Sequence, residues 1–286
     1  MVVLASPVER QAREAEIIAA YPELLQKKLA ACGQPKRERN LHRCGSPACP
    51  TCRRLRGRAE GRRAIEFMAG AAGYDLSLLT VGIGVARDLW QVAGMNQKFT
   101  FDCRNLVRAE RKDWPGRRWG GFRLYGWPEI DVIHRDDMPY MPDRLRGYVA
   151  ASQPDWNKDG VVFAAHWHLI VDGSGLDRQE VGAAFMDQWP VEGAVDIRPF
   201  HASRSVVDNI TSIAGYAHRF KVGKMWDGVA MNWWPSRPTA DMYAVLAEAR
   251  WVGKRFVINP VKSNIPQLLT NDGSKKYEYE PMSWLV

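Results

Sequence analysis

The amino-acid sequence predicts an α+β protein built on a split βαβ, ferredoxin-like antiparallel sheet with helices over one face. Between residues 76 and 221, apolar runs rich in β-branched residues alternate with amphipathic stretches in the order strand, helix, strand, strand, helix, strand, helix. The chain has 286 residues, of which 46% are hydrophobic, so it can bury a sizeable core. An N-terminal helical and cysteine-rich segment precedes the sheet.

The first part of the chain is predicted to be helical. Ser6 and Glu9 form a capping box, which predicts a helix over residues 7–20. Pro22 interrupts this pattern because the residue before a proline avoids helical angles, and a second helix should follow to residue 30. We expect this region to serve packing rather than chemistry.

A cysteine-rich segment follows these helices. Cys49 and Cys52 are separated by two residues in a loop punctuated by proline and glycine, a spacing that lets two thiolates reach one Zn²⁺ at about 2.3 Å. Cys44 supplies a third sulfur, and either Cys32 or His42 could complete the tetrahedron. The sequence therefore predicts a structural zinc site; a metal-free turn and a redox pair are the alternatives.

Positive charge is concentrated around the cysteines. Residues 36–63 contain ten Lys and Arg against two acids, which accounts for the whole net charge of +8. Arg54, Arg58 and Arg62 recur at every fourth position of a predicted helix, so they should share one face, and Arg53 precedes them. Such a field is typical of a protein that binds a phosphate backbone, the alternative being a solvated basic surface.

The predicted sheet begins after this basic helix. The expected elements are a strand over residues 76–82, a helix over 95–112, a second strand or bulged pair over 121–133, and a long surface insertion over 135–159. Glu129 and Asp131 are two positions apart in the second strand, so their carboxylates should share one face of the sheet.

The most informative strand covers residues 163–171. Because side chains alternate along a strand, His166 and His168 point to one face while Trp167 and Leu169 point to the other. Two imidazoles side by side on a rigid element can bind a divalent metal. The alternative is two unrelated histidines, one of them buried and hydrogen-bonded.

The remaining elements are assigned from the same periodicities. We expect a helix opening at Asp177, a strand over 193–200, a helix over 206–221, an aromatic loop over 226–234, a helix over 239–250, a strand over 251–258 and a frayed tail over 275–286. In the helix over 206–221, Tyr216 lies beside an apolar stripe.

The sequence also limits where the protein acts. The longest nearly apolar run, residues 76–86, is well short of the roughly 20 residues that span a membrane. The first residues lack the apolar core of a signal peptide, and five cysteines fit poorly with a secreted disulfide framework. We expect a soluble cytoplasmic protein with no membrane partner.

The order of these motifs carries a resemblance to a known family. The apolar strand over 78–81, then His166-Trp167-His168, then a helical Tyr216 followed by basic residues resembles the HUH-type rolling-circle replication initiators, the plasmid and phage Rep endonucleases. The cysteine-rich residues 44–53 look like those of the bacterial plasmid branch. The resemblance covers roughly residues 30–225.

The resemblance implies a domain organisation and partners. It implies an N-terminal basic zinc segment over 1–74, an HUH endonuclease domain over 75–225 and a C-terminal extension over 226–286. The implied substrate is single-stranded or hairpin origin DNA, and the implied protein partners are a host helicase and polymerase. A transposase or mobilisation relaxase with the same chemistry, or a non-enzymatic zinc-ribbon DNA-binding regulator, are the alternative functions.

The resemblance also implies catalytic roles. Tyr216 would attack the scissile phosphate and form a 5′-phosphotyrosyl intermediate, with Tyr243 as the competing candidate. His166 and His168, together with Glu129 or Asp131, would hold Mn²⁺ or Mg²⁺.

Two positions depart from the family pattern. Family members often have a lysine three residues after the tyrosine, whereas this chain has Arg219 there and its nearest lysine is Lys221. Some relatives carry a terminating carboxylate one turn before the tyrosine, where this chain has Ser212; Asp208, two turns before, is the available substitute.

Overall fold

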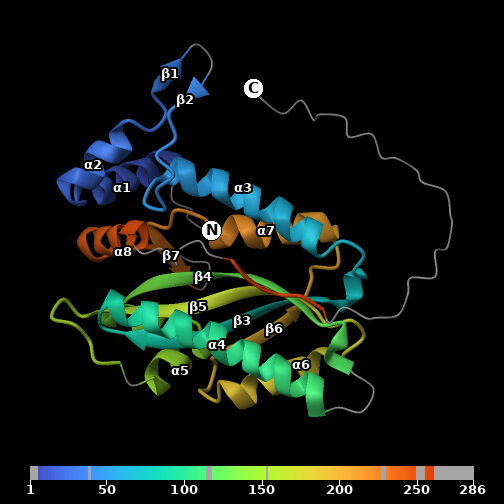
Figure 1. The fold of residues 1–286 in the computed structure, drawn as a ribbon. Helices are drawn as coiled ribbons and strands as arrows, with labels where there is room; N and C mark the ends of the chain where they lie inside the picture. Colours follow the sequence, from blue (N-terminus) through green and yellow to red (C-terminus); the bar gives the residue numbers. More distant parts are fainter. Residues whose placement is uncertain are drawn as a thin grey trace.

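A five-stranded antiparallel sheet forms the centre of the computed structural model, which describes residues 6–37, 40–113, 118–152, 154–226, 230–248 and 255–260 (Figure 1). The strand order is β6-β3-β5-β4-β9, so the histidine strand β5 is the middle strand. The sheet strands are β3 (Leu76–Ala86), β4 (Arg123–His134), β5 (Val161–Asp172), β6 (Val195–Pro199) and β9 (Phe256–Ile258). The predicted α+β class with an antiparallel sheet is confirmed.

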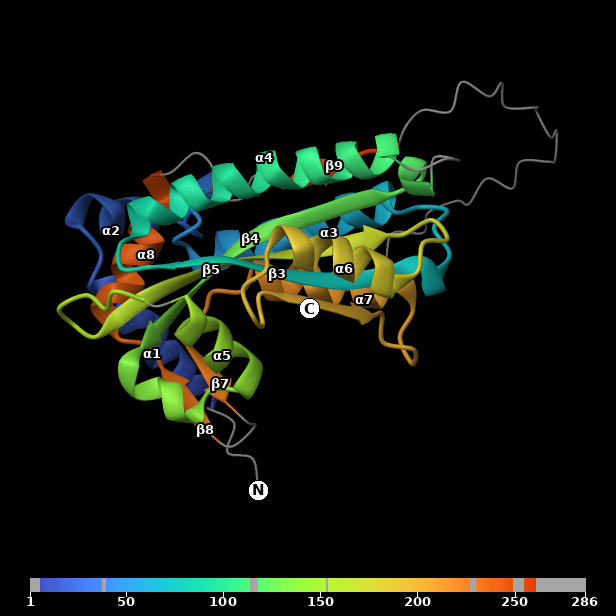
Figure 2. The same ribbon diagram turned by 90° about the horizontal axis from the view of Figure 1, so that it is seen from below.

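Helices cover both faces of the sheet, and the expectation of helices on one face only was wrong (Figures 1 and 2). Helices α4 (Leu89–Asp113) and α6 (Arg178–Gln188) pack on the face that carries Trp167 and Leu169. Helices α3 (Pro50–Phe67) and α7 (Val206–Ala217) pack on the opposite face, beside Ile170. The cause is the composition of β5, which is apolar on both faces and must be covered on both.

The smaller elements surround this core. They are α1 (Pro7–Ala19), α2 (Glu23–Ala30), the β1 (Pro35–Arg37) and β2 (Asn40–Leu41) hairpin, α5 (Asp143–Ala151), the β7 (Gly223–Trp226) and β8 (Ala230–Trp233) hairpin, and α8 (Ser236–Glu248). The predicted capping box of Ser6 and Glu9 is present at the start of α1. No helix in the described ranges is both long and apolar enough to cross a membrane.

Helix α7 is shorter than the sequence indicated. The periodicity suggested a helix over residues 206–221, but α7 ends at Ala217, and His218 follows as its C-cap residue. The chain then turns, so that Lys221 is buried instead of lying on the exposed continuation of a helix. The end of α7 therefore decides where the basic residues after Tyr216 point.

Helix α5 corrects the expectation of a surface insertion over residues 135–159. Two glycines allow this helix to pack against the sheet. A Cβ atom on Gly82 would lie 2.6 Å from Cζ of Tyr148, and one on Gly193 would lie 2.5 Å from the carbonyl oxygen of Arg144. Because Tyr148 is buried over β3, α5 forms a wall beside the histidines.

Helix α3 approaches α7 closely through two glycines one turn apart. A Cβ atom on Gly57 would lie 3.0 Å from Cβ of His218, and one on Gly61 would lie 3.5 Å from Cβ of Ala214. Arg53, near the start of α3, donates a hydrogen bond of 3.4 Å to the carbonyl of Ala217. The two helices therefore lie in a fixed relative position.

The C-terminal region joins the main structure. β9 pairs with β4 as an edge strand, and Trp234 and Tyr243 are buried in the core that includes α1. The expected helix and strand after residue 238 are present as α8 and β9. In the region of the expected aromatic loop, β7 and β8 pair as antiparallel strands; residues 227–229 lie outside the described residues. The predicted tail over 275–286 lies outside the described residues.

The close approach of α3 and α7 gives a stability prediction. Gly57→Leu should lower the free energy of unfolding by about 1–3 kcal/mol, because the new side chain overpacks against His218. The measurement is urea unfolding followed by circular dichroism. Gly94→Leu is the matched control, since a Cβ atom on Gly94 of α4 meets nothing within 4 Å; an equal destabilisation of both variants would contradict this packing.

The buried His218 gives a pH prediction. Burial lowers its pKa from 6.5 to about 4, and its Nδ1 lies 2.9 Å from the carbonyl oxygen of Ala214. The unfolded chain therefore takes up this proton at higher pH than the folded chain. The stability it contributes is complete above pH 6.5 and is lost as the pH falls towards 4, by at most about 1.4 kcal/mol per pH unit. His218→Gln should flatten the stability profile in that window, as measured by urea unfolding; an unchanged slope would contradict the assignment.

Candidate active site

Strand pairing brings three candidate metal ligands together. Glu129 of β4 lies opposite His166 of β5, and His168 follows two positions along on the same face. One ligand atom from each of the three residues can be chosen so that all lie within 4.8 Å of one another. The prediction that His166 and His168 share one face is confirmed, and register places Glu129 on that face too, so the group could bind a metal.

Hydrogen bonding orients this group. Thr80 lies opposite His168 on β3, and its Oγ1 is 3.2 Å from Nδ1 of His168. The Nε2 atom of His168 is therefore directed to Oε2 of Glu129, at 2.5 Å, and Nε2 of His166 lies 3.3 Å from the same oxygen. Two imidazoles and a carboxylate fit a borderline divalent ion, and a partner on the second ring nitrogen is typical of a histidine ligand.

Lys221 contacts both carboxylates of β4. Its buried ammonium forms ion pairs with Oε1 of Glu129 and, at 2.9 Å, with Oδ1 of Asp131. The structure thus groups Glu129, and not Asp131, with the histidines among the described residues. Asp131, the alternative ligand in the sequence, lies one pleat further along β4 and outside this group.

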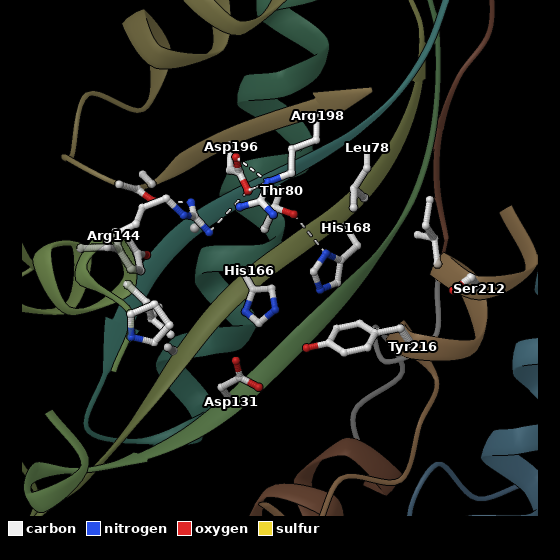
Figure 3. A pocket seen from close by; sticks show the side chains of 18 residues that line it. Leu78, Thr80, Asp131, Arg144, His166, His168, Asp196, Arg198, Ser212 and Tyr216 are labelled. Carbon is white, nitrogen blue, oxygen red and sulfur yellow. Dashed lines mark hydrogen bonds and ion pairs between the residues drawn. The ribbon is translucent and has the colours of Figure 1, made fainter. Parts of the chain in front are cut away.

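Tyr216 reaches the same group from α7 (Figure 3). Its ring centroid is 5.4 Å from that of His168 in an edge-to-face arrangement, and Nζ of Lys221 is 4.7 Å from the ring centroid. The residue keeps 43% of its surface exposed. Desolvation, and then the negative charge of Asp131, raise the pKa of the tyrosine hydroxyl, so Tyr216 is a neutral phenol in the free protein.

Tyr243, the competing tyrosine, does not reach this pocket. It is 1% exposed, stacks on Phe220, and its hydroxyl accepts a 2.6 Å bond from the backbone N–H of Lys221. The hydroxyl also donates to the carbonyl of Lys221 at 3.0 Å. Tyr243 therefore holds the backbone of Lys221 in place.

His166 and His168 line a cavity of about 600 Å³, whereas Glu129 lies behind them and does not line it. Figure 3 shows His166 and His168 between Tyr216 on one side and Arg144 on the other. The cavity is lined from β3, β4, β5, β6, α5 and α7 by apolar side chains and by Thr80, Asp131, Arg144, Asp196, Arg198 and Ser212. The sequence did not indicate that residues of α5 and β6 would line this cavity. The one available signal was the alternation of Asp196 and Arg198 along a strand, which places both side chains on the same face of the sheet.

The other residues expected near Tyr216 have different positions. Arg219 is exposed, and its backbone N–H donates to the carbonyl of Tyr216 at 3.1 Å; partial burial and then Arg10 lower the pKa of its guanidinium. Ser212 lines the cavity. Asp208 lies in the first turn of α7, where it bonds the capping Ser205, so it serves the helix end.

The cysteine segment forms a second candidate metal centre. Cys32, Cys44, Cys49 and Cys52 have their sulfurs within 4.8 Å of one another, and three of the pairs are 3.6 Å apart. Four ligands at about 2.3 Å from a tetrahedral zinc have sulfurs about 3.8 Å apart, so the cluster is consistent with structural zinc. Cys32, and not His42, completes the group.

A hairpin explains why Cys32 is the fourth member. Backbone bonds join Gly33 to His42 and His42 to Gln34, which fold the chain back beside Cys44. Burial opposes ionisation of Cys32, but the Cys44 backbone N–H and the neighbouring thiols outweigh it and lower the pKa of Cys32 to about 7. One thiolate is thus available near neutral pH.

The predicted arginine face is present on α3, with one exception. Arg54, Arg58 and Arg62 are exposed and recur along one side of the helix. Arg53 was grouped with them but points inward, because it lies one residue, or about 100°, away around the helix. It contacts Ala217, and its guanidinium lies 5.3 Å from the ring centroid of Tyr243.

Comparison with protein-family models, with curated proteins and with solved structures gives no significant match. The geometry of the two centres is therefore the basis for interpreting them.

The cysteine cluster gives a prediction for metal content. The purified protein should hold about one zinc per chain, and Cys32→Ser should lose most of it, because three thiolates bind the ion more weakly than four. His42→Ala and Cys103→Ala should retain the zinc, since neither residue belongs to the cluster. Elemental analysis after gel filtration measures this; retention in Cys32→Ser with loss in His42→Ala would contradict it.

Proposed function

We propose that this protein is a rolling-circle plasmid replication initiator: a metal-dependent, site-specific endonuclease and ligase that cuts single-stranded DNA through a tyrosyl intermediate. The observation that carries the proposal is Tyr216, whose ring lies 5.4 Å from that of His168, in a cavity that both histidines of the candidate metal group also line. The five-stranded antiparallel sheet with the histidines on its middle strand supports the assignment to the HUH-type initiators.

The donor set fits a divalent ion. His166, His168 and Glu129 would hold Mn²⁺ or Mg²⁺, which supplies positive charge to the non-bridging oxygens of a phosphate and stabilises the charge of the transition state. Lys221 neutralises one unit of the negative charge of Glu129 and Asp131. With neutral imidazoles, Glu129, Asp131 and Lys221 together carry one negative charge, which offsets part of the charge of a divalent ion.

The chain supplies the nucleophile and a proton acceptor. The Oη atom of Tyr216 would form a bond to phosphorus while the bond from phosphorus to the 3′ oxygen breaks, leaving a 5′-phosphotyrosyl enzyme and a free 3′-OH. The phenol must lose a proton in this step, and the leaving 3′ oxygen must gain one, so the net reaction moves one proton from Tyr216 to the 3′ oxygen. Asp131 lines the same cavity and acts electrostatically on the Tyr216 hydroxyl, so its carboxylate is our candidate acceptor.

The cysteine cluster and the basic helix would bind the DNA. Cys49 is the residue before α3, and Cys52 lies in its first turn, so zinc would fix the start of the helix. Arg54, Arg58 and Arg62 then form an exposed row on a helix that packs against α7, which carries the tyrosine. These features alone would also suit a zinc-ribbon regulator, which the nicking test separates from an endonuclease.

The nucleophile is tested by covalent capture. A labelled single-stranded origin oligonucleotide incubated with the protein and Mn²⁺ should give a covalent adduct on a denaturing gel. Tyr216→Phe should reduce the adduct by at least about 100-fold, because no other described tyrosine lines the cavity near the histidines except Tyr148, which is buried. The matched control, Tyr140→Phe, removes an exposed hydroxyl and should change nothing.

Two results would reject the endonuclease. One is no adduct with the wild-type protein on any origin oligonucleotide; the other is an undiminished adduct in Tyr216→Phe. His168→Ala should abolish cleavage while DNA binding persists, and retained cleavage in that variant would reject the metal assignment.

The arginine row is tested by salt dependence. The triple variant Arg54→Gln, Arg58→Gln, Arg62→Gln should bind single-stranded DNA more weakly, and its log Kd should depend less steeply on log salt, by about 0.7 for each phosphate that the arginines no longer neutralise. Fluorescence anisotropy from about 50 to about 300 mM salt measures this. A triple change at Arg108, Arg146 and Arg237, which lie elsewhere, is the charge-matched control; equal effects would contradict a specific role for α3.

A further inference from the structure

The cavity beside the histidines extends well away from Tyr216, and this part has no role in the chemistry described above. It lies between α5 and β6 and is bordered by Arg144, Asp196 and Arg198. A volume of about 600 Å³ is within the range of small-molecule sites, about 300–1,000 Å³. A scissile phosphate at the histidines would leave this volume for an adjoining part of the strand.

Close packing of α5 against the sheet fixes the walls of this region. Gly82 and Gly193 allow α5 to approach the sheet, and the guanidinium of Arg144 donates a 2.7 Å bond to the carbonyl of Gly193. Apolar side chains of α5 and of the residues before β6 complete the lining, among them Leu145 and Ala194. Such walls suit a flat, apolar ring rather than a second phosphate.

The polar border has one acceptor between two donors. Nε of Arg198 lies 3.1 Å from Oδ1 and 2.9 Å from Oδ2 of Asp196, and Nη2 of Arg144 lies 3.8 Å from Oδ2. A carboxylate offers about four lone-pair directions, so Asp196 keeps capacity for further donors. Both arginines keep exposed surface, which leaves N–H groups for an acceptor on a ligand.

The position relative to the histidines is set by strand register. Asp196 lies opposite Thr80, and Thr80 lies opposite His168, so all three point to the same face of adjacent strands. Two strand spacings separate Asp196 from His168, or roughly 10 Å between their backbones. A nucleotide whose phosphate lies at the histidines can place its base in this region.

We propose that this region, which we call the α5–β6 subsite, binds a guanine base next to the scissile phosphate and so sets sequence preference; this rests on the proposed endonuclease function. Guanine presents two adjacent N–H donors, at N1 and N2, beside the acceptor O6. The carboxylate of Asp196 matches the two donors, and a guanidinium of Arg144 or Arg198 matches O6. Cytosine, adenine and thymine each lack such a pair of adjacent donors.

The experiment uses the full-length protein and a library of single-stranded oligonucleotides with a randomised central segment. Bound strands are recovered without divalent ion and sequenced, and the selected sequence is then measured by anisotropy with each of the four bases at every position. The wild type should show one position at which guanine binds at least about fivefold more tightly than the other bases. Asp196→Asn should remove that preference, because an amide cannot accept from both donors.

The control is a carboxylate that lies far from the cavity. Asp187→Asn removes an exposed carboxylate on α6, on the opposite face of the sheet, and should keep the guanine preference. The proposal is overturned if no position prefers guanine, or if Asp196→Asn keeps the wild-type profile. A tyrosyl adduct that forms without any guanine preference would reject the subsite and leave the endonuclease intact, whereas no binding of single-stranded DNA would reject both.

Discussion

The register of the three central strands is the constraint on which the candidate site depends. Pairing Glu129 with His166, and Thr80 with His168, places a carboxylate, two imidazoles and a hydroxyl on one face of β4, β5 and β3. A shift by one residue would turn every one of these side chains to the opposite face, where Trp167 and Leu169 are buried against α4 and α6. The apolar core on that face therefore fixes the polar group on the other.

The second constraint is the path of the chain after α7. Helix α7 packs closely on α3 through Gly57 and Gly61, so it carries Tyr216 to the histidines in a fixed position. Two further contacts then direct the following residues. Tyr243 bonds the backbone of Lys221 on both its N–H and its carbonyl, and the ammonium of Lys221 reaches the two carboxylates of β4. The same helix pair thus links the cysteine cluster at the start of α3 to the tyrosine.

The sequence predicted the parts of the site that depend on local periodicity. Alternation along a strand placed His166 and His168 together, and cysteine spacing indicated a metal centre. The choice of Glu129 over Asp131, however, depends on strand register and on the distant Lys221, and the choice of Cys32 over His42 depends on a hairpin.

The remaining differences also have non-local causes. Residues 206–221 are periodic throughout, yet α7 ends at Ala217, after which Lys221 forms buried ion pairs. The packing of α5 depends on Gly82 and Gly193, which lie far from it in the sequence. Arg53 was grouped with the basic row because it precedes it in the sequence. Its position around the helix directs its side chain inward, to the carbonyl of Ala217.

The central claim is that Glu129, His166 and His168 hold a divalent ion that faces Tyr216. Its most direct test is a crystal of the full-length protein soaked in Mn²⁺ and measured near the manganese absorption edge. The account predicts an anomalous peak bonded to Nε2 of both histidines and to a carboxylate oxygen of Glu129, on the side of the Tyr216 ring. A peak bonded to neither histidine, or no peak with Lys221 still paired to Glu129, would contradict it.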